Sequence, residues 1–467
     1  MDFREIPVIA LSELIRSKQM SAREVMEIAI KNIEELNPRI NAFVALDLEK
    51  AMAEAKIKDE EIARGDSVGV FTGIPLGVKD LEDAAGFKTT HGSALFANDP
   101  VKQQDSNLVR RLKAAGAIVV GKTNTPEFGW KPDTENTTFG PTRNPWNLKR
   151  SPGGSSGGSA AAIASGMVPI ATGSDGGGSI RIPSAACGLS GFKPSLGRVP
   201  TGGSDPADWK DLSTKGVMAR RISDIVALLD VSVGPEPSDL RSLPMPESAW
   251  AGALDGAHVP ALIAWSPNLG YAQVDDEIRT ICQDATSLLE ELGARVVEID
   301  SVFDEDPISK WLCEVAVYSS KMISGFEGTE LMSQVDPGLA AIANWGKTIS
   351  GVELAMAQEY GHYLNLKLIE IFHQARVLVL PTVAGQLPEC GGVGKINGQG
   401  DMNWVKFTYP FNQTRSPAAT VTVGFTSDGM PVGLQIVGPQ HGDQVVLRTA
   451  AALEEAIGIE STAPRPA

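Results

Sequence analysis

The stretch "SPGGSSGGSA" (residues 151–160) places four glycines and four serines in ten positions, and "DGGGSIRIP" (residues 175–183) follows soon after it. A flexible linker has a similar composition, but a linker separates independent segments. Residues 151–160 instead run into "SAAAIASG", which is typical of a buried helix of small residues. We therefore expect a tight loop at a helix N-terminus, with Ser159 as the N-cap.

The second stretch places three glycines directly before Ser179. Successive glycines can turn their backbone N–H groups into one concavity that binds an anion, as an oxyanion hole requires. An ordinary glycine-rich turn with a helix-capping serine explains the pattern equally well. Lys79 ends the apolar run "IPLGVK", and burial there would disfavour its ammonium form and yield a base. A surface lysine whose ammonium group reaches solvent is the alternative.

Outward from these stretches, short apolar runs alternate with helical patterns from residue 74 onward. Such runs predict an α/β protein whose sheet is covered by helices on both faces. Ser21 and Glu24 form a capping box that opens a helix, which we expect to stop at Asn37-Pro38. We expect an N-terminal helical extension over residues 1–65. A single domain over residues 66–467 should contain a mostly helical insertion at about residues 303–365.

Two short motifs suggest other chemistry. "GAIVVGKT" (residues 116–123) matches a phosphate-loop pattern, but its stiff Ala-Ile-Val-Val interior belongs in a strand. "GGSSG" matches the nucleophile elbow of α/β-hydrolases around Ser155, yet a polar, proline-broken segment precedes it where a buried strand is required. Neither motif carries its function here.

Composition excludes further classes. The chain has 467 residues and a formal net charge of −16, which disfavours a nucleic-acid partner. The first residues do not resemble a signal peptide, and no apolar stretch is long enough to span a membrane. The four cysteines and five histidines are scattered without metal-ligand spacing. We expect a cytoplasmic protein without a membrane partner, with unpaired thiols and no metal site.

Taken together, the motifs resemble the amidase signature family. The resemblance rests on "FTGIPLGVKDLEDAAGFKTTHGS", "NPWNLKRSPGGSSGGSAAAIASG", "GSDGGGSIRIPSAACGLSGFKPS" and "FNQTRSPAATVTVGFTSDGMPVGLQIVG". These segments span nearly the whole chain. The resemblance implies an α/β fold with a large, mixed, mostly parallel twisted sheet covered by helices on both faces.

The resemblance also implies the site. Lys79 matches the family's lysine, Ser155 its bridging serine with an unusual cis backbone, and Ser179 its nucleophile. The backbone N–H groups of Gly176, Gly177 and Gly178 would form the oxyanion hole. Residues that match supporting positions are Ser156, Asp175 and Arg181. Hydrolysis would proceed through an acyl-enzyme, without metal or cofactor.

One branch of this family is the glutamine-hydrolysing component of the tRNA-dependent amidotransferase, its A subunit. The Arg-Tyr-Asp-rich stretch of that branch is absent from "DPISKWLCEVAVYSSKMISGFEGTELM", so we favour a free-standing hydrolase, a monomer or homodimer. Aromatic side chains with few charges nearby suggest an apolar pocket, although any one of them could instead fill the core. The candidates are Phe128, Trp130, Trp311, Tyr318 and Trp345. The expected substrates are uncharged aryl or alkyl amides, with esters or carbamates as side substrates.

Overall fold

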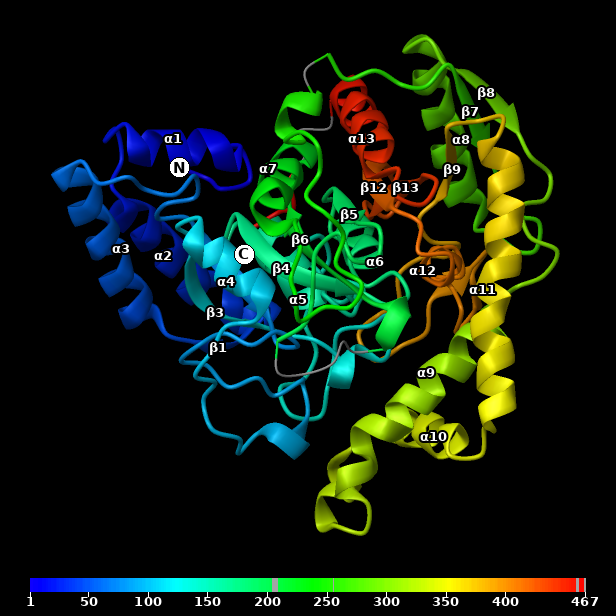
Figure 1. The fold of residues 1–467 in the computed structure, drawn as a ribbon, viewed down its shortest axis with the longest axis horizontal. Helices are drawn as coiled ribbons and strands as arrows, with labels where there is room; N and C mark the ends of the chain where they lie inside the picture. The colour runs from blue at the N-terminus through cyan, green and yellow to red at the C-terminus, as the bar shows by residue number, and fades with distance from the viewer. Residues whose placement is uncertain (204–208, 255, 459–461, 466–467) are drawn as a thin grey trace.

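The computed structural model describes residues 1–203, 209–254, 256–458 and 462–465 (Figure 1). The strands are β1 (Phe43–Leu46), β2 (Pro75–Lys79), β3 (Ile118–Thr123), β4 (Ile170–Asp175), β5 (Gly191–Lys193), β6 (Thr214–Ala219), β7 (Leu262–Trp265), β8 (Arg295–Glu298), β9 (Val377–Pro381), β10 (Lys395–Ile396), β11 (Gln399–Gly400), β12 (Ala418–Phe425) and β13 (Pro431–Val437). The α-helices are α1 (Val8–Arg16), α2 (Ala22–Ile40), α3 (Leu48–Arg64), α4 (Asn107–Ala114), α5 (Gly157–Ala164), α6 (Arg181–Ala186), α7 (Ile222–Ser232), α8 (Asp276–Glu291), α9 (Ile308–Ile323), α10 (Pro337–Gly346), α11 (Gly351–Phe372), α12 (Pro410–Gln413) and α13 (Asp443–Ile457).

The main strands form two sheets, with orders β1-β3-β2-β4-β6 and β5-β12-β13-β9-β7-β8. The neighbours β3, β2 and β4 are parallel, as are β9, β7 and β8, whereas the remaining ladders of the two sheets are antiparallel. Edge strands β5 and β6 contact each other without forming a ladder. The mixed α/β class is thus confirmed, and the expected single sheet is divided at this point.

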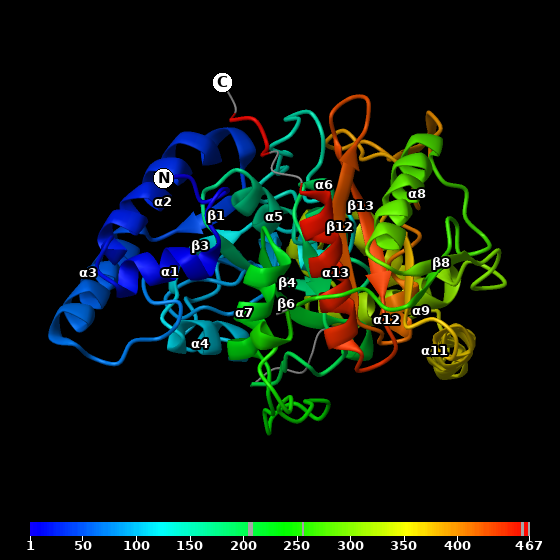
Figure 2. The same cartoon turned by 90° about the horizontal axis from the view of Figure 1, so that it is seen from above.

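Helices enclose the sheets on both faces (Figure 2). The side of β13 that carries Gly433 and Gln435 faces α6, whereas Leu434 and Ile436 lie in the core shared with α8 and α13. Every residue of β2, β3 and β4 is buried, and each strand begins with apolar residues and ends with polar ones.

The N-terminal helices belong to the same hydrophobic core, and β1 adds an antiparallel edge to β3. The capping box at Ser21 is confirmed, but the predicted stop at Asn37-Pro38 is wrong, because α2 continues to Ile40. The Asn37 side chain bonds both backbone groups of Phe43, and buried Ile40 packs into the core, so the last turn is held despite the proline. The domain boundary at residue 65 stays a prediction.

Ser159 is not the N-cap that its sequence position suggests. Helix α5 begins at Gly157 with Ser156 as the N-cap residue, so Ser159 lies inside the helix. Its hydroxyl donates to the Thr172 carbonyl at 2.8 Å and contacts the Thr123 hydroxyl at 2.7 Å. Ser159 therefore ties α5 to the two strands beneath it.

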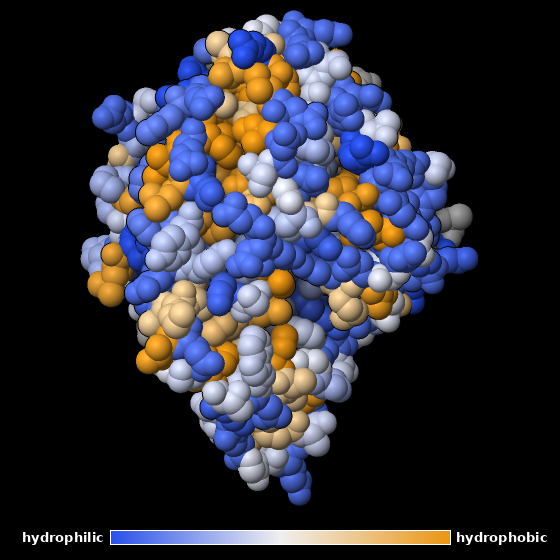
Figure 3. All heavy atoms as spheres, turned by 90° about the vertical axis from the view of Figure 1, so that its right-hand side faces the viewer, coloured by the Kyte–Doolittle hydropathy of each residue, from blue (hydrophilic) through white to orange (hydrophobic). Residues whose placement is uncertain are grey.

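Helices α9, α10 and α11 occupy most of the segment in which we expect a helical insertion, and they lie along one edge of the molecule (Figure 1). Apolar patches interrupt the hydrophilic surface on the side of the molecule where α11 lies (Figure 3). On this helix Val352, Met356, Tyr363 and Leu366 are exposed. Within the described ranges, no helix is both long and apolar enough to cross a bilayer.

The glycines at the start of α5 allow the helix backbone to lie close to the backbone of Asn124. A Cβ on Gly158 would lie 2.4 Å from the backbone nitrogen of Asn124, which cannot move aside as a flexible side chain can. We expect Gly158→Ala to lower the free energy of unfolding by about 1–3 kcal/mol in urea denaturation. Gly351→Ala is the matched control, since a Cβ there meets nothing within 4 Å and alanine favours the helix. Equal stability of the two variants would contradict the packing argument.

Candidate functional site

The candidate site lies at the carboxyl ends of two parallel strands. Lys79 is the last residue of β2, and Ser174 and Asp175 end β4 beside it. Carboxyl ends of neighbouring parallel strands meet at one edge of a sheet, where ligand sites commonly form. The glycine run, residues 176–178, leaves β4 at this edge and leads to Ser179.

The Lys79 side chain is completely buried among serine hydroxyls. Its Nζ lies 2.8 Å from the Oγ atoms of both Ser155 and Ser156, and 3.0 Å from Ser174 Oγ. We call these four residues the serine–lysine cluster. The Gly154–Ser155 peptide is cis, as the resemblance implies. The sequence analysis did not single out Ser174. Its place at the end of the strand that leads into the glycine run is the feature that could have identified it.

Ser179 shares a narrow cleft with the serine–lysine cluster. The cleft is lined by Ser155, Ser174 and Ser179, with Phe128 on one side. The Ser179 carbonyl accepts the backbone N–H of Ser156 at 3.2 Å, so the two glycine-rich loops are joined directly. The structure therefore brings together Lys79, Ser155 and Ser179, which lie up to a hundred residues apart in the sequence.

Side chains from distant segments fix the peptide groups of the glycine run. The Asp175, Gly176 and Gly177 carbonyls accept hydrogen bonds from Asn412 Nδ2 (2.8 Å), Trp311 Nε1 (3.0 Å) and Thr408 Oγ1 (2.6 Å) in that order. The Gly178 N–H donates to Asp175 Oδ1 at 2.8 Å. This N–H is therefore occupied, whereas no hydrogen bond takes the N–H of Gly176, Gly177 or Ser179 among the residues described.

Asp175 and Arg181 form a fully buried ion pair behind the glycine run. Arg181 Nη2 lies 2.8 Å from Asp175 Oδ1, and Nε lies 3.0 Å from Oδ2. Burial alone would raise the pKa of Asp175, but the Arg181 charge and hydrogen bonds hold it well below its ordinary value. The carboxylate stays ionised at neutral pH, so its contribution to stability is complete above about pH 4 and is lost as acidification passes the lowered pKa.

A larger cavity of about 440 Å³ opens from Ser179. Two of the five predicted pocket residues, Trp130 and Trp311, line it. Phe128 lies instead at the narrow cleft, Tyr318 packs beside Trp209 outside the lining, and Trp345 is 43% exposed on α10. Tyr318 and Trp345 therefore do not line this cavity, because the direction of a helical side chain depends on how the insertion packs. The lining that sequence reasoning missed includes Trp209, Leu312, Ile342, Trp404, Val405 and Tyr409.

Among the described residues, the charged side chains that line this cavity come from one loop, which contributes Lys131, Asp133 and Glu135. Lys131 Nζ is 2.9 Å from Glu135 Oε1 and 3.5 Å from Asp336 Oδ2, at the start of α10. Burial raises the pKa of Asp133, which accepts a hydrogen bond from Ser151. The cation is thus neutralised locally, and the other lining residues are mainly apolar or aromatic.

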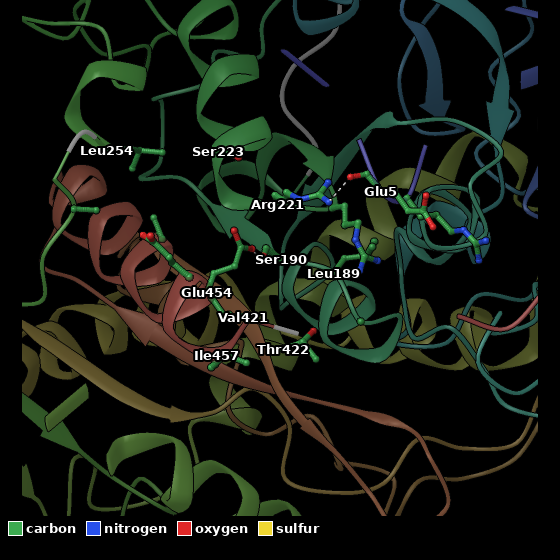
Figure 4. A pocket seen from close by; sticks show the side chains of 17 residues that line it. Glu5, Leu189, Ser190, Arg221, Ser223, Leu254, Val421, Thr422, Glu454 and Ile457 are labelled. Carbon is green, nitrogen blue, oxygen red and sulfur yellow. Dashed lines mark hydrogen bonds between the residues drawn. The ribbon is translucent and has the colours of Figure 1, made fainter. Parts of the chain in front are cut away.

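A buried lysine and a second cavity lie outside the serine–lysine cluster. Lys122, in the phosphate-loop pattern, is completely buried and bonds the Glu82 carbonyl and Asp80, so its role is structural. A cavity of about 710 Å³ near α13 has Arg221 and Glu454 among its lining (Figure 4) and lies apart from the serine–lysine cluster. No group of three or more His, Cys, Asp or Glu residues able to hold a metal occurs in the described part of the chain.

Replacing Asp175 by asparagine leaves the Arg181 charge buried without its counter-charge. We expect Asp175→Asn to lower the free energy of unfolding by about 3–5 kcal/mol in urea denaturation. Asp66→Asn is the matched control, because the Arg64–Asp66 pair is exposed and should contribute less than about 1 kcal/mol. Similar losses of unfolding free energy in the two variants would mean that the buried pair contributes no more to stability than the exposed pair does.

Both the sequence and the structure of the chain are similar to those of known proteins. The model of the Amidase family matches residues 24–447. The chain is 35% identical to the Acylamidase of Rhodococcus erythropolis over 94% of its length and 93% of the relative. It is 33% identical to the A subunit of the Glutamyl-tRNA(Gln) amidotransferase of Geobacillus thermodenitrificans, over 98% of each chain. The solved structure of a bacterial aryl acylamidase of the amidase signature enzymes superposes with a TM-score of 0.91 at 29% identity, covering 97% of this chain and 96% of that one.

Proposed function

The chain belongs to the amidase signature family and is an amide hydrolase, and from this premise we propose that Ser179 is its nucleophile, activated by Lys79 through Ser155. The observation that carries the proposal is the 2.8 Å contact between Lys79 Nζ and Ser155 Oγ at a cleft that Ser179 also lines. A base, a bridging hydroxyl and a nucleophile within one cleft are what covalent catalysis by serine requires.

In this scheme Lys79, as the unprotonated amine, takes a proton from Ser155 while Ser155 takes one from Ser179. Ser179 Oγ then attacks the amide carbonyl carbon and forms a tetrahedral intermediate. The proton returns along the relay to the leaving nitrogen, the C–N bond breaks, and the amine departs. Water attacks the resulting ester on Ser179 and releases the acid. Ser156 and Ser174 hold the Lys79 side chain in place through their hydroxyls.

We assign the oxyanion hole to the backbone N–H groups of Gly176, Gly177 and Ser179. This assignment refines the one drawn from sequence, because the Gly178 N–H already donates to Asp175. Gly178 instead ties the loop to the buried Asp175–Arg181 pair, which supports the glycine run from behind. Preorganised donors of this kind stabilise the charge that develops on the carbonyl oxygen.

The substrate we propose is an uncharged aryl or alkyl amide, with activated esters or aryl carbamates as side substrates. Support comes from the aromatic and aliphatic walls of the cavity that opens from Ser179, and from the acylamidase relatives. Glutamine carries an ammonium and a carboxylate that would need fixed partners. Lys131, the cation among the described lining residues, already pairs with Glu135 and Asp336. A cytoplasmic location and a monomeric or homodimeric state stay predictions.

The relay predicts that Ser179→Ala removes essentially all hydrolysis, and that Lys79→Ala and Ser155→Ala each leave only a trace. Residues that act as a unit lose about 10³-fold or more in kcat when one of them is removed. Release of nitroaniline from p-nitroacetanilide measures the rates. Mass spectrometry after treatment with a sulfonyl fluoride should find the label on Ser179. Ser333→Ala, at an exposed serine of the insertion, is the matched control; full activity in Ser179→Ala would end the nucleophile assignment.

Butanamide and free glutamine give a matched test of the apolar cavity. Butanamide is the glutamine side chain without its two charges, so the pair isolates the effect of those charges. We expect kcat/KM to favour butanamide by about 100-fold or more, because a charge buried without a partner costs several kcal/mol. Preference for glutamine would overturn the substrate proposal and point to the amidotransferase branch.

A further inference from the structure

One side chain joins the substrate cavity to the glycine run. Trp311 lines the cavity, and its indole N–H donates to the Gly176 carbonyl at 3.0 Å. The ring also lies directly on the next residue, where a Cβ on Gly177 would come within 2.4 Å of it. Trp311 therefore contacts both of the residues that the Gly176–Gly177 peptide group joins.

The orientation of this peptide group decides where one proposed oxyanion donor points. In a trans peptide the C=O and the following N–H point in opposite directions. A hydrogen bond that holds the Gly176 carbonyl toward Trp311 therefore holds the Gly177 N–H toward the opposite side. Gly177 and Ser179 both line the cavity, so the residue that carries this N–H lies near the nucleophile.

Trp311 differs from the other side chains that hold the glycine run. Asn412 and Thr408 also bond Arg181, through a side-chain oxygen and a backbone carbonyl, so they belong to the buried network beneath the run. Trp311 comes from α9 in the helical insertion and is only half-buried. Its ring is positioned by stacking on Tyr409, with centroids 5.5 Å apart and planes at 28°.

Tyr409 is held firmly in turn. Its hydroxyl donates to Asp306 Oδ1 at 2.5 Å and accepts from Asn403 Nδ2 at 2.9 Å. Asp306 lies just before α9, so the contact fixes the start of the helix that carries Trp311. The indole thus has a defined position on both its ring face and its N–H edge.

We propose that Trp311 is a positioning residue, whose indole N–H orients the Gly176–Gly177 peptide so that the Gly177 N–H faces the developing oxyanion. The proposal rests on the proposed function of Ser179. It gives the helical insertion a part in the chemical step in addition to its part in forming the cavity wall.

Trp311→Phe tests the proposal, because phenylalanine keeps an aromatic ring but lacks the N–H. Trp345→Phe makes the same change at an exposed position of the same insertion and is the matched control. With p-nitroacetanilide we expect kcat of Trp311→Phe to fall about tenfold or more while KM stays within about twofold. Loss of a direct oxyanion donor lowers kcat by about 10²–10³-fold, which sets the upper limit.

A trifluoromethyl ketone, which forms an oxyanion adduct with a serine nucleophile, gives a second readout. Its inhibition constant should rise in Trp311→Phe by the same factor by which kcat/KM falls, since both report stabilisation of the oxyanion. A crystal structure of the variant should show the Gly176 carbonyl no longer held in one orientation. Trp345→Phe should match the unaltered protein in all three measurements.

The outcomes separate this proposal from the function on which it rests. A Trp311→Phe protein with unchanged kcat, or with a change in KM alone, would show that Trp311 is only a cavity wall. An unchanged Gly176–Gly177 peptide in the variant crystal structure would also overturn the proposal, whatever the activity. Inactivity of the unaltered protein toward anilides, esters and sulfonyl fluorides would instead contradict the function itself.

Discussion

The buried Asp175–Arg181 ion pair is the interaction on which the site depends. Asp175 accepts the N–H of Gly178, while Arg181 reaches the Thr408 carbonyl and the Asn412 and Gln435 side chains, more than 220 residues further along the chain. A three-glycine segment has no side chains with which to hold its own shape. The ion pair gives it a shape by fixing it between β4 and the segments around β13.

Local sequence patterns explain which parts of the site could be predicted from the sequence. Glycine-rich loops and a lysine at a strand end are unusual enough to be noticed, and the family resemblance assigns their roles to Lys79, Ser155 and Ser179. Thr408 and Asn412 stand in no glycine-rich pattern, and each reaches the glycine run by hydrogen bonds from a segment far away in the sequence. Their part follows only from the packing of the second sheet against the first.

The fold was predictable to a similar degree and for a similar reason. Long apolar runs such as β3 and β13 mark buried strands, and capping residues mark the start of α2. The short strand β5 has too few residues to show a period, and the division into two sheets depends on whether it pairs with β6. The directions of the side chains on the helices of the insertion could not be predicted either. Trp311 faces the cavity and Trp345 faces solvent, although both lie on helices of the same segment.

The cavity walls come from parts of the chain that are separate from the sheet edge carrying the serine–lysine cluster. Helices α9 and α10 supply one wall, and the segment over residues 388–405 supplies another. Substitutions in these walls can accumulate without disturbing the strands that hold Lys79 and Ser174. A protein built in this way can acquire new substrates by substitutions in the cavity walls alone. The condition is that the indole that holds the glycine run is kept or replaced by another hydrogen-bond donor.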